Sequence, residues 1–82
     1  MTSGGVRPQA HEVIDAGERR CGEMIIFLKS AVERLRPGQI LELNCHDPAA
    51  PEEVPAWCRI TRHRLVWADG PIFLIERKEG SR

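Results

Sequence analysis

The chain has 82 residues, 41% of them hydrophobic, which is the size and composition of one small globular domain. Its 12 Lys and Arg balance 12 Asp and Glu, so the formal net charge is zero and a protein that binds nucleic acid by neutralising phosphates is not expected. A chain this short buries a single core without enclosing a deep active site, so we expect any chemistry to take place at the surface with a partner.

No targeting or membrane signal stands out in the sequence. The longest apolar run, residues 24–28, is followed at once by Lys29, whereas a membrane span needs about 20 apolar residues. Residues 1–5 lack the apolar stretch of a signal peptide. We therefore expect a cytoplasmic protein with no membrane partner. Its three cysteines should be reduced thiols, and their odd number argues against a disulfide framework.

The first half of the chain predicts a tail, a strand and a helix. Residues 1–10 mix Gly, Ser, Pro and Gln without periodicity, which predicts a flexible N-terminal tail. Residues 11–15 predict a short strand that ends in a turn at Ala16-Gly17. Over residues 22–36 apolar side chains recur at helical spacing, which predicts an amphipathic helix stopped by Pro37-Gly38.

A second strand and a second helix follow. Residues 39–46 alternate apolar and polar side chains, the pattern of a strand with one buried face. The loop that begins at Asp47 then leads to a helix that Glu52-Glu53 favour at its start and that ends at about Arg62. Pro55 is compatible with this helix only within its first turn.

The last part of the chain predicts a hairpin and completes the fold. Residues 63–68 and 72–75 are strand candidates on either side of the turn signal Asp69-Gly70. The order β-α-β-α-β-β predicts an α/β (α+β) fold: a two-layer sandwich with a four-stranded mixed sheet and two helices on one face. Residues 11–78 would form this single domain, and residues 79–82 a charged C-terminal tail.

Several non-polar residues are expected in the core. Cys45 alternates with leucines on its strand, and Cys58 lies in the middle of the second helix, so both thiols should be buried. A second role for Cys58, as a resolving thiol, stays open. Trp57 and Trp67 should anchor the core between helices and sheet, although one of them could be partly exposed at a protein interface.

Cys21 is the residue most suggestive of chemistry, because it lies where a turn enters a helix. The free N–H groups at a helix start and the helix dipole stabilise anions. Arg19 and Arg20 add positive potential, and Glu23 opposes it modestly. This setting favours the nucleophilic thiolate and would equally stabilise a persulfide anion. The alternative is that Cys21 is a small, inert residue at the helix start.

Residues of the types that bind zinc are also present: Cys45, His46, Asp47, Cys58 and His63. The sequence contains no Cys-x-x-Cys pair, and alternation along a strand places Cys45 and His46 on opposite faces. The sequence therefore predicts no metal site and no cofactor. Asp47 is expected to form a turn.

Basic residues could gather on one surface of the folded chain. The candidates are Arg19, Arg20, Arg59, Arg62, His63 and Arg64. In a chain of balanced charge such residues usually form a solvated face. The functional alternative is a docking patch for an acidic partner protein, and a direct contact with RNA is not expected.

Taken in order, these features resemble the TusA/SirA-type sulfur-carrier proteins. The stretch from Gly17 to Cys21 resembles the approach to the family's cysteine with one residue of spacing changed, and Pro37-Gly38 and Asp47-Pro48 lie in the expected places. Residues 54–58 resemble the family's second helix and residues 73–78 its last strand. The resemblance covers residues 11–78, but the family's Cys-Pro-x-Pro motif is Cys-Gly-Glu-Met in this chain, from Cys21 to Met24.

The resemblance implies a sulfur carrier rather than an independent enzyme. Cys21 would accept sulfur as a persulfide from a donor such as a cysteine desulfurase and pass it to an acceptor protein. Arg19, Arg20, Gly22 and Glu23 would stabilise the sulfur or dock the partner. The two missing prolines motivate an alternative, a non-catalytic interaction or redox-regulatory module on the same fold.

Overall fold

The computed structural model describes residues 8–17 and 21–78, with only the backbone of residues 21 and 22. Four strands and two helices follow one another in the predicted order. They are β1 (Glu12–Gly17), α1 (Cys21–Glu33), β2 (Ile40–Cys45), α2 (Ala50–Thr61), β3 (Arg64–Asp69) and β4 (Ile72–Glu76). Residues 1–7 of the predicted N-terminal tail, and all of the predicted C-terminal tail at residues 79–82, lie outside the described residues.

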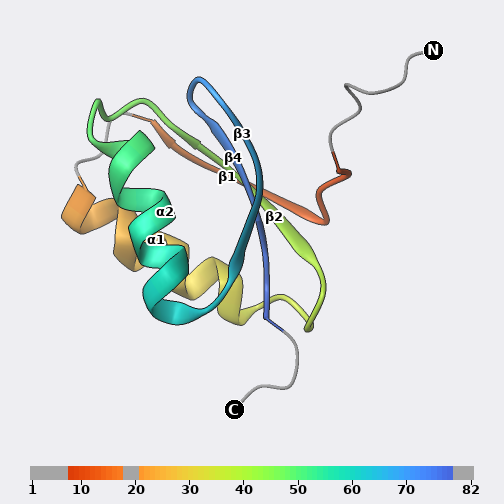
Figure 1. Cartoon of the computed structure of the whole chain (residues 1–82). Coiled ribbons are helices and arrows are strands. Elements are labelled where there is room, and N and C mark those ends of the chain that lie inside the picture. Colours follow the sequence, from red (N-terminus) through yellow and green to blue (C-terminus); the bar gives the residue numbers. More distant parts are fainter. Residues whose placement is uncertain (1–7, 18–20, 79–82) are drawn as a thin grey trace.

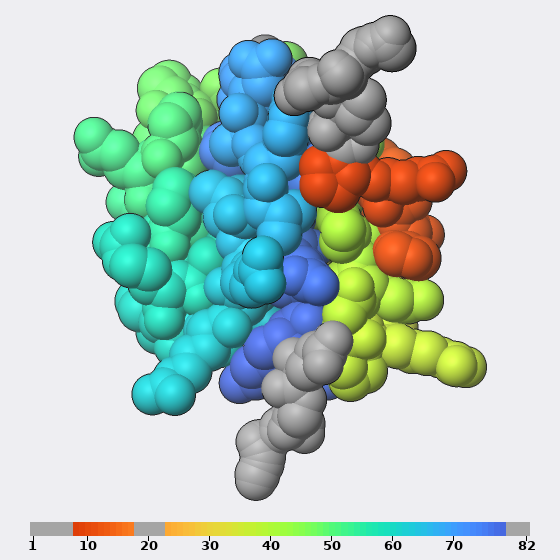
Figure 2. All heavy atoms as spheres, turned by 45° about the vertical axis from the view of Figure 1, so that its right-hand side comes forward, coloured from red at the N-terminus to blue at the C-terminus, as the bar shows by residue number. Residues whose placement is uncertain are grey.

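The strands form one mixed sheet in the order β1-β2-β4-β3. β1 and β2 are parallel and joined by α1, whereas β4 runs antiparallel to both of its neighbours. Both helices cover one face of this sheet (Figure 1). In Figure 2 the strands come forward, with β3 and β4 in blue between α2 and β2. The predicted two-layer sandwich is confirmed, and both helices run antiparallel to β2, so they begin at the same end of the molecule.

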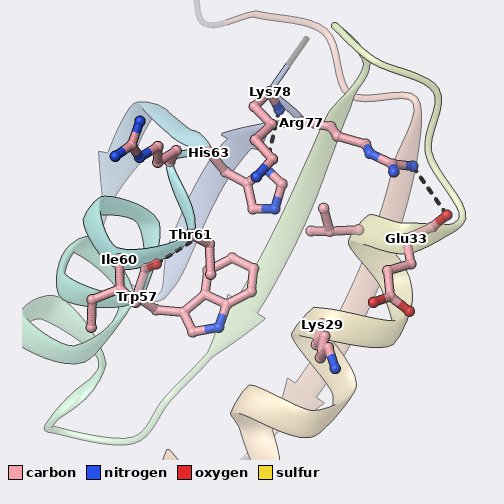
Figure 3. A pocket seen from close by; sticks show the side chains of 10 residues that line it. Lys29, Glu33, Trp57, Ile60, Thr61, His63, Arg77 and Lys78 are labelled. Atoms are coloured by element: carbon pink, nitrogen blue, oxygen red, sulfur yellow. Dashed lines mark hydrogen bonds between the residues drawn. The ribbon is translucent and has the colours of Figure 1, made fainter. Parts of the chain in front are cut away.

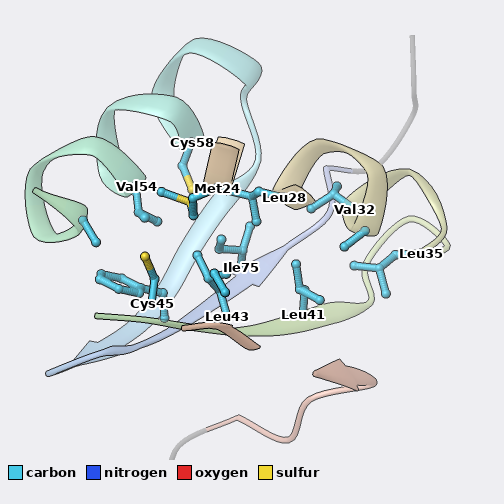
Figure 4. Close-up of a cluster of buried hydrophobic side chains, with 14 residues drawn as sticks. Met24, Leu28, Val32, Leu35, Leu41, Leu43, Cys45, Val54, Cys58 and Ile75 are labelled. Carbon is cyan, nitrogen blue, oxygen red and sulfur yellow. The ribbon is translucent and has the colours of Figure 1, made fainter. Parts of the chain in front are cut away.

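The core lies between the helices and the sheet (Figure 4). Met24, Leu28, Val32 and Val54 project from the helices, while Leu41, Leu43, Phe73 and Ile75 come from the two central strands. Cys45 and Cys58 lie in the same cluster, which confirms that both thiols are buried. The periodicities of the sequence therefore identify most of this core correctly.

The first helix ends earlier than its apolar pattern predicts. α1 stops at Glu33, yet Leu35 remains buried. The backbone tightens there: the N–H of Arg34 donates to the Ala31 carbonyl at 3.1 Å, and the N–H of Leu35 to the Val32 carbonyl at 3.0 Å. These i→i+3 bonds are typical of a helix C-terminus and keep the last apolar residue on the core face.

The second helix begins at Ala50, inside the stretch predicted as a loop from which Asp or Pro could open it. The Asp47 side chain accepts a hydrogen bond from the N–H of Ala49 at 3.1 Å, and the Asp47 carbonyl accepts one from Ala50 at 2.9 Å. This turn, as expected for Asp47, leads directly into α2 at Ala50. Pro55 consequently lies in the second turn, so its predicted restriction to the first turn is wrong. Because proline has no N–H, the carbonyl of Pro51, four residues earlier, has no donor within the helix.

The two tryptophans lie on opposite faces of the sheet. Trp57 packs, half-buried, against the core as predicted. On β3 the register shifts between Leu65 and Trp67, so Leu65 pairs with the core residue Ile75 whereas Trp67 pairs with Leu74 on the face without helices. The predicted core position of Trp67 is wrong because a β-bulge breaks the simple alternation of strand side chains.

Candidate functional site

The backbone places Cys21 at the N-terminus of α1, where it is the first helical residue. Three residues later Met24 is fully buried in the core, so its side chain holds the first helical turn against the sheet. The N–H groups of a first helical turn have no acceptor within the helix. Residue 21 therefore lies at the positive end of a helix, where the backbone N–H groups have no acceptor within the helix itself.

The end of β1 leads the chain toward this helix start. The sequence predicts a strand that ends at Asp15, whereas the observed strand continues through a register shift to Gly17. The Gly17 N–H donates to Asp15 Oδ1 at 2.9 Å, and its carbonyl accepts from the N–H of His46 at 2.8 Å. Its φ of +60° is readily adopted by glycine. These bonds attach the exit of β1 to the exit of β2, beside the end of the molecule where α1 begins.

The predicted neighbours of Cys21 are described to different extents. Arg19 and Arg20 lie outside the described residues, as do the side chains of positions 21 and 22. Glu23 is exposed in the first turn of α1, where a carboxylate interacts favourably with the helix dipole. The roles expected for Arg19, Arg20 and Gly22 in stabilising sulfur or docking a partner stay predictions.

The other two thiols lie inside the fold rather than at a helix start. Cys45 and Cys58 are both buried free cysteines. Burial raises the pKa of Cys58 to about 11, so this thiol stays protonated at neutral pH. A protonated thiol is a poor nucleophile. A resolving role for Cys58 stays a prediction, and it would require the helix to expose the sulfur first.

Two large apolar side chains are exposed on α1 within two turns of Cys21. Ile26 is 69% exposed and Phe27 is 47% exposed, and both lie away from the core positions Met24 and Leu28. Hydrophobic side chains at this density on one short helix are typical of a surface that contacts another protein. The sequence pattern shows them only as residues that do not fit the core face.

The zinc-type residues do not converge. Among the residues that the structure describes, no three His, Cys, Asp or Glu side chains form a group that could hold a metal ion. Cys45, His46 and Asp47 border a shallow hollow with Gly70 and Pro71, whereas His63 lies at the other end of α2. The described residues thus bring no metal-ligand set together.

Part of the predicted basic cluster does come together, at the far end of the helices. Arg62 and His63 line a cleft between α1 and α2 (Figure 3). Three further cations line it that the sequence pattern did not single out: Lys29, Arg77 and Lys78. No local signal could have identified them, because they come from α1 and from the end of β4.

Within the described chain, no helix has the length and apolarity that crossing a membrane requires. A family model described as sulfurtransferase TusA matches residues 12–76, which includes all six secondary-structure elements.

Proposed function

Because the chain belongs to the TusA sulfurtransferase family, which implies a sulfur-carrier role, we propose that Cys21 carries sulfur as a persulfide from a donor protein to an acceptor protein. The single observation that best supports this proposal is the position of Cys21 as the first residue of a 13-residue helix. The free N–H groups and the dipole at that position favour a sulfur anion. A cysteine desulfurase is the donor that the family resemblance implies.

The proposed transfer is a thiol–persulfide exchange. The Cys21 thiolate attacks the outer sulfur of the donor persulfide, and a new S–S bond forms while the donor S–S bond breaks. The donor leaves as a thiolate, and the oxidation level of the transferred sulfur is unchanged. An acceptor thiolate then attacks the outer sulfur on Cys21 in the same way and releases the Cys21 thiolate. No external oxidant or reductant is required.

The residues around Cys21 would tune this sulfur anion. Gly22 and Met24 occupy positions where the family motif has prolines, and both retain a backbone N–H that proline lacks. We expect the Gly22 N–H to be available to the sulfur, and Arg19 and Arg20 to add positive potential. Glu23 lowers that potential modestly, which would ease release of the sulfur to the acceptor.

The exposed apolar pair on α1 supplies a contact surface for the donor. Ile26 and Phe27 lie one to two turns from Cys21 on the same rigid helix. A partner that covers them would be held at a defined distance from the thiol. We therefore expect donor docking and sulfur transfer to depend on different residues.

The first experiment measures sulfur loading by intact mass. The reduced full chain is incubated with glutathione persulfide, a small donor that needs no docking surface, and separately with a cysteine desulfurase and L-cysteine. We expect a gain of about 32 Da, one sulfur atom on the thiolate, mapped to Cys21 in both reactions. Cys21→Ser should abolish the gain, whereas Cys58→Ala should retain it because that thiol is buried and protonated.

The two donors separate chemistry from docking. Ile26→Glu should leave loading by glutathione persulfide unchanged and slow loading by the desulfurase, with Arg34→Gln as a surface control distant from the apolar pair. Loading that persists in Cys21→Ser would move the site to another thiol. Loading by no donor, including several desulfurases, would contradict the carrier role and favour an interaction module on the same fold.

A further inference from the structure

The cleft between the C-terminal halves of α1 and α2 has the size of a small-ligand site. Its volume is about 370 Å³, near the lower end of typical ligand pockets. Lys29 and Glu33 line it from α1, and Trp57, Ile60 and Thr61 line it from α2 (Figure 3). It lies at the opposite end of the helices from Cys21, so sulfur transfer does not use it.

The charged groups of this cleft are unbalanced. Lys29, Arg62, Arg77 and Lys78 line it together with a single carboxylate, that of Glu33. In the part of the chain that the structure describes, no carboxylate pairs with Lys29, Arg62 or Lys78. The C-termini of both helices add about one negative charge in total, which still leaves an excess of positive charge.

A groove beside the cleft extends the positive surface. Arg62, Arg77 and Lys78 line this groove as well as the cleft, and Arg64 and Glu76 complete it. Arg64 Nε and Glu76 Oε1 form an ion pair at 3.6 Å, so the charges of these two side chains largely offset one another. A bound anion could therefore draw on Arg62 and Lys78 from either side.

The uncharged polar groups of the cleft also offer donors. His63 Nδ1 accepts the backbone N–H of Lys78 at 3.1 Å, so the neutral ring carries its proton on Nε2. Burial, and then the charges of Lys78 and Arg77, lower the pKa of His63, which keeps it neutral at pH 7. The indole N–H of Trp57 has no acceptor among the described residues.

The cleft wall is aromatic and apolar. The rings of Trp57 and His63 lie with their centroids 5.4 Å apart and their planes inclined by 33° (Figure 3). Ile60, which is 80% exposed, extends this wall toward the rim. Such a surface suits the flat face of a ring, since stacking on an indole does not require hydrogen bonds.

Arg62 has a backbone conformation that favours glycine. Its φ of 71° and ψ of 14° place it in the left-handed region directly after α2. It is the one non-glycine residue with positive φ in the described chain. Glycine commonly ends helices in this conformation because other side chains are strained there. An arginine in a strained position at a cleft suggests that its guanidinium has a use.

From these observations we propose that the cleft binds a phosphate ester joined through a sugar to a planar ring, which is the chemistry of a nucleotide. The negative charge of the phosphate matches Lys29, Arg62 and Lys78, none of which pairs with a carboxylate among the described residues, and the donor His63 Nε2. The ring lies against Trp57 and Ile60. The ligand could be a free nucleotide, whose phosphate is a monoester, or one nucleotide of single-stranded RNA, whose phosphate is a diester, since both join a phosphate to a base through a ribose.

The test uses two-dimensional NMR of the full chain, because its two indole N–H groups report on opposite faces of the sheet. Adding AMP should shift the Trp57 indole signal with a dissociation constant on the order of 1 mM, while the Trp67 signal stays in place. Adenosine and inorganic phosphate, each at matched ionic strength, should bind more weakly than AMP. The proposal would be overturned if adenosine or inorganic phosphate bound as tightly as AMP, or if about 10 mM AMP did not shift the Trp57 signal.

Three variants sharpen the test. Arg62→Gly should weaken AMP binding about threefold to fivefold and raise the melting temperature, because it removes a cation and relieves the backbone strain. Glu33→Gln should strengthen binding by removing the opposing carboxylate. Arg34→Gln, a matched loss of charge beside Glu12 of the opposite edge strand, should change nothing. Unchanged AMP affinity in Arg62→Gly would overturn the proposed role of this cleft.

A final arm identifies the source of the nucleotide. If a short single-stranded RNA shifts the Trp57 signal with a dissociation constant more than tenfold lower than that of AMP at equal salt, the site is assigned to RNA. Affinity per nucleotide equal to that of AMP assigns it to a free mononucleotide. Cys21→Ser should give the same result as the unchanged chain, so failure of the sulfur-carrier proposal would not affect this one.

Discussion

The two ends of the helical layer differ in the hydrogen bonds that the backbone makes there. At the end where both helices begin, backbone groups bond to each other, as between the Gly17 carbonyl and the His46 N–H. At the end where both helices finish, one cationic side chain also bonds to the backbone: the Arg77 guanidinium donates to the carbonyls of Glu33 and Leu35. The N–H groups of the first turn of α1 have no acceptor within the helix, whereas at the other end Arg77 covers two carbonyls.

This difference follows from the helix dipoles and from chain topology. Because β1, β2 and β3 are parallel to one another, both crossover helices run in the same direction. Their positive ends therefore lie together near Cys21, and their negative ends lie together at the cleft. Anionic sulfur suits the first end without added side chains, but the second end becomes positive only through its arginines and lysines.

The largest expected effect tests what holds the thiol end in place. Met24→Ala removes a fully buried side chain from the first turn of α1 and should lower the free energy of unfolding by about 2–4 kcal/mol, measured by urea denaturation. Amide exchange in the first turn of α1 should accelerate as well. Met24→Leu keeps the volume and should cost less than about 1.5 kcal/mol. Equal stability of the alanine variant would show that the core does not anchor this turn.

An intermediate effect tests the cleft end. Arg77→Met keeps the apolar stem but removes the hydrogen bonds to the α1 carbonyls, so unfolding should become easier by about 1–2 kcal/mol. Arg77→Lys retains the charge without the planar fork and should fall between the two proteins. If the lysine variant were as stable as the unchanged chain, the positive charge rather than the hydrogen-bond geometry of Arg77 would stabilise this end of the helical layer.

The smallest expected effect is a pH dependence confined to the cleft end. The pKa of His63 is lower in the folded chain than its usual value of about 6.5, so the unfolded chain binds more protons in that range. The stability that neutral His63 contributes is present above about pH 6.5 and is lost as the pH falls through the lowered pKa. When the pH is lowered, the melting temperature should therefore fall more for the unchanged chain than for His63→Asn.

The asparagine variant retains an acceptor for the Lys78 N–H and has no titrating group. Melting curves at about pH 7.5 and about pH 5.5 give the comparison directly. An identical decrease for both proteins would mean that other groups, such as carboxylates, account for the whole pH dependence.

The sequence alone predicted much of the fold and one end of the candidate site. The order of elements, the start of a helix at Cys21 and the hairpin turn at Gly70 follow from local patterns. The boundaries were less accurate where backbone hydrogen bonds override periodicity, as they do after Glu33 and at Gly17. Pro55 lies in the second turn of α2 rather than the first, because a turn formed by Asp47 makes the helix begin at an earlier residue.

The cleft could not be predicted in the same way. Arg77 meets the end of α1 although 44 residues separate it from Glu33. The sequence shows Arg77-Lys78 only as part of a charged C-terminal stretch, without any indication of which helix it approaches. The pairing of β4 between β2 and β3 decides this contact, and strand order in a sheet is not encoded by local periodicity.

By itself, then, the sequence determined the order of the helices and strands, the apolar face of most of them, and that a cysteine begins a helix. Those properties depend on side-chain spacing and turn chemistry over a few residues. Only the tertiary structure decided that both helix starts lie at one end, that Trp67 is on the face without helices, and that cations from three elements line one cleft. Such features depend on strand order and register, which join residues distant in the chain.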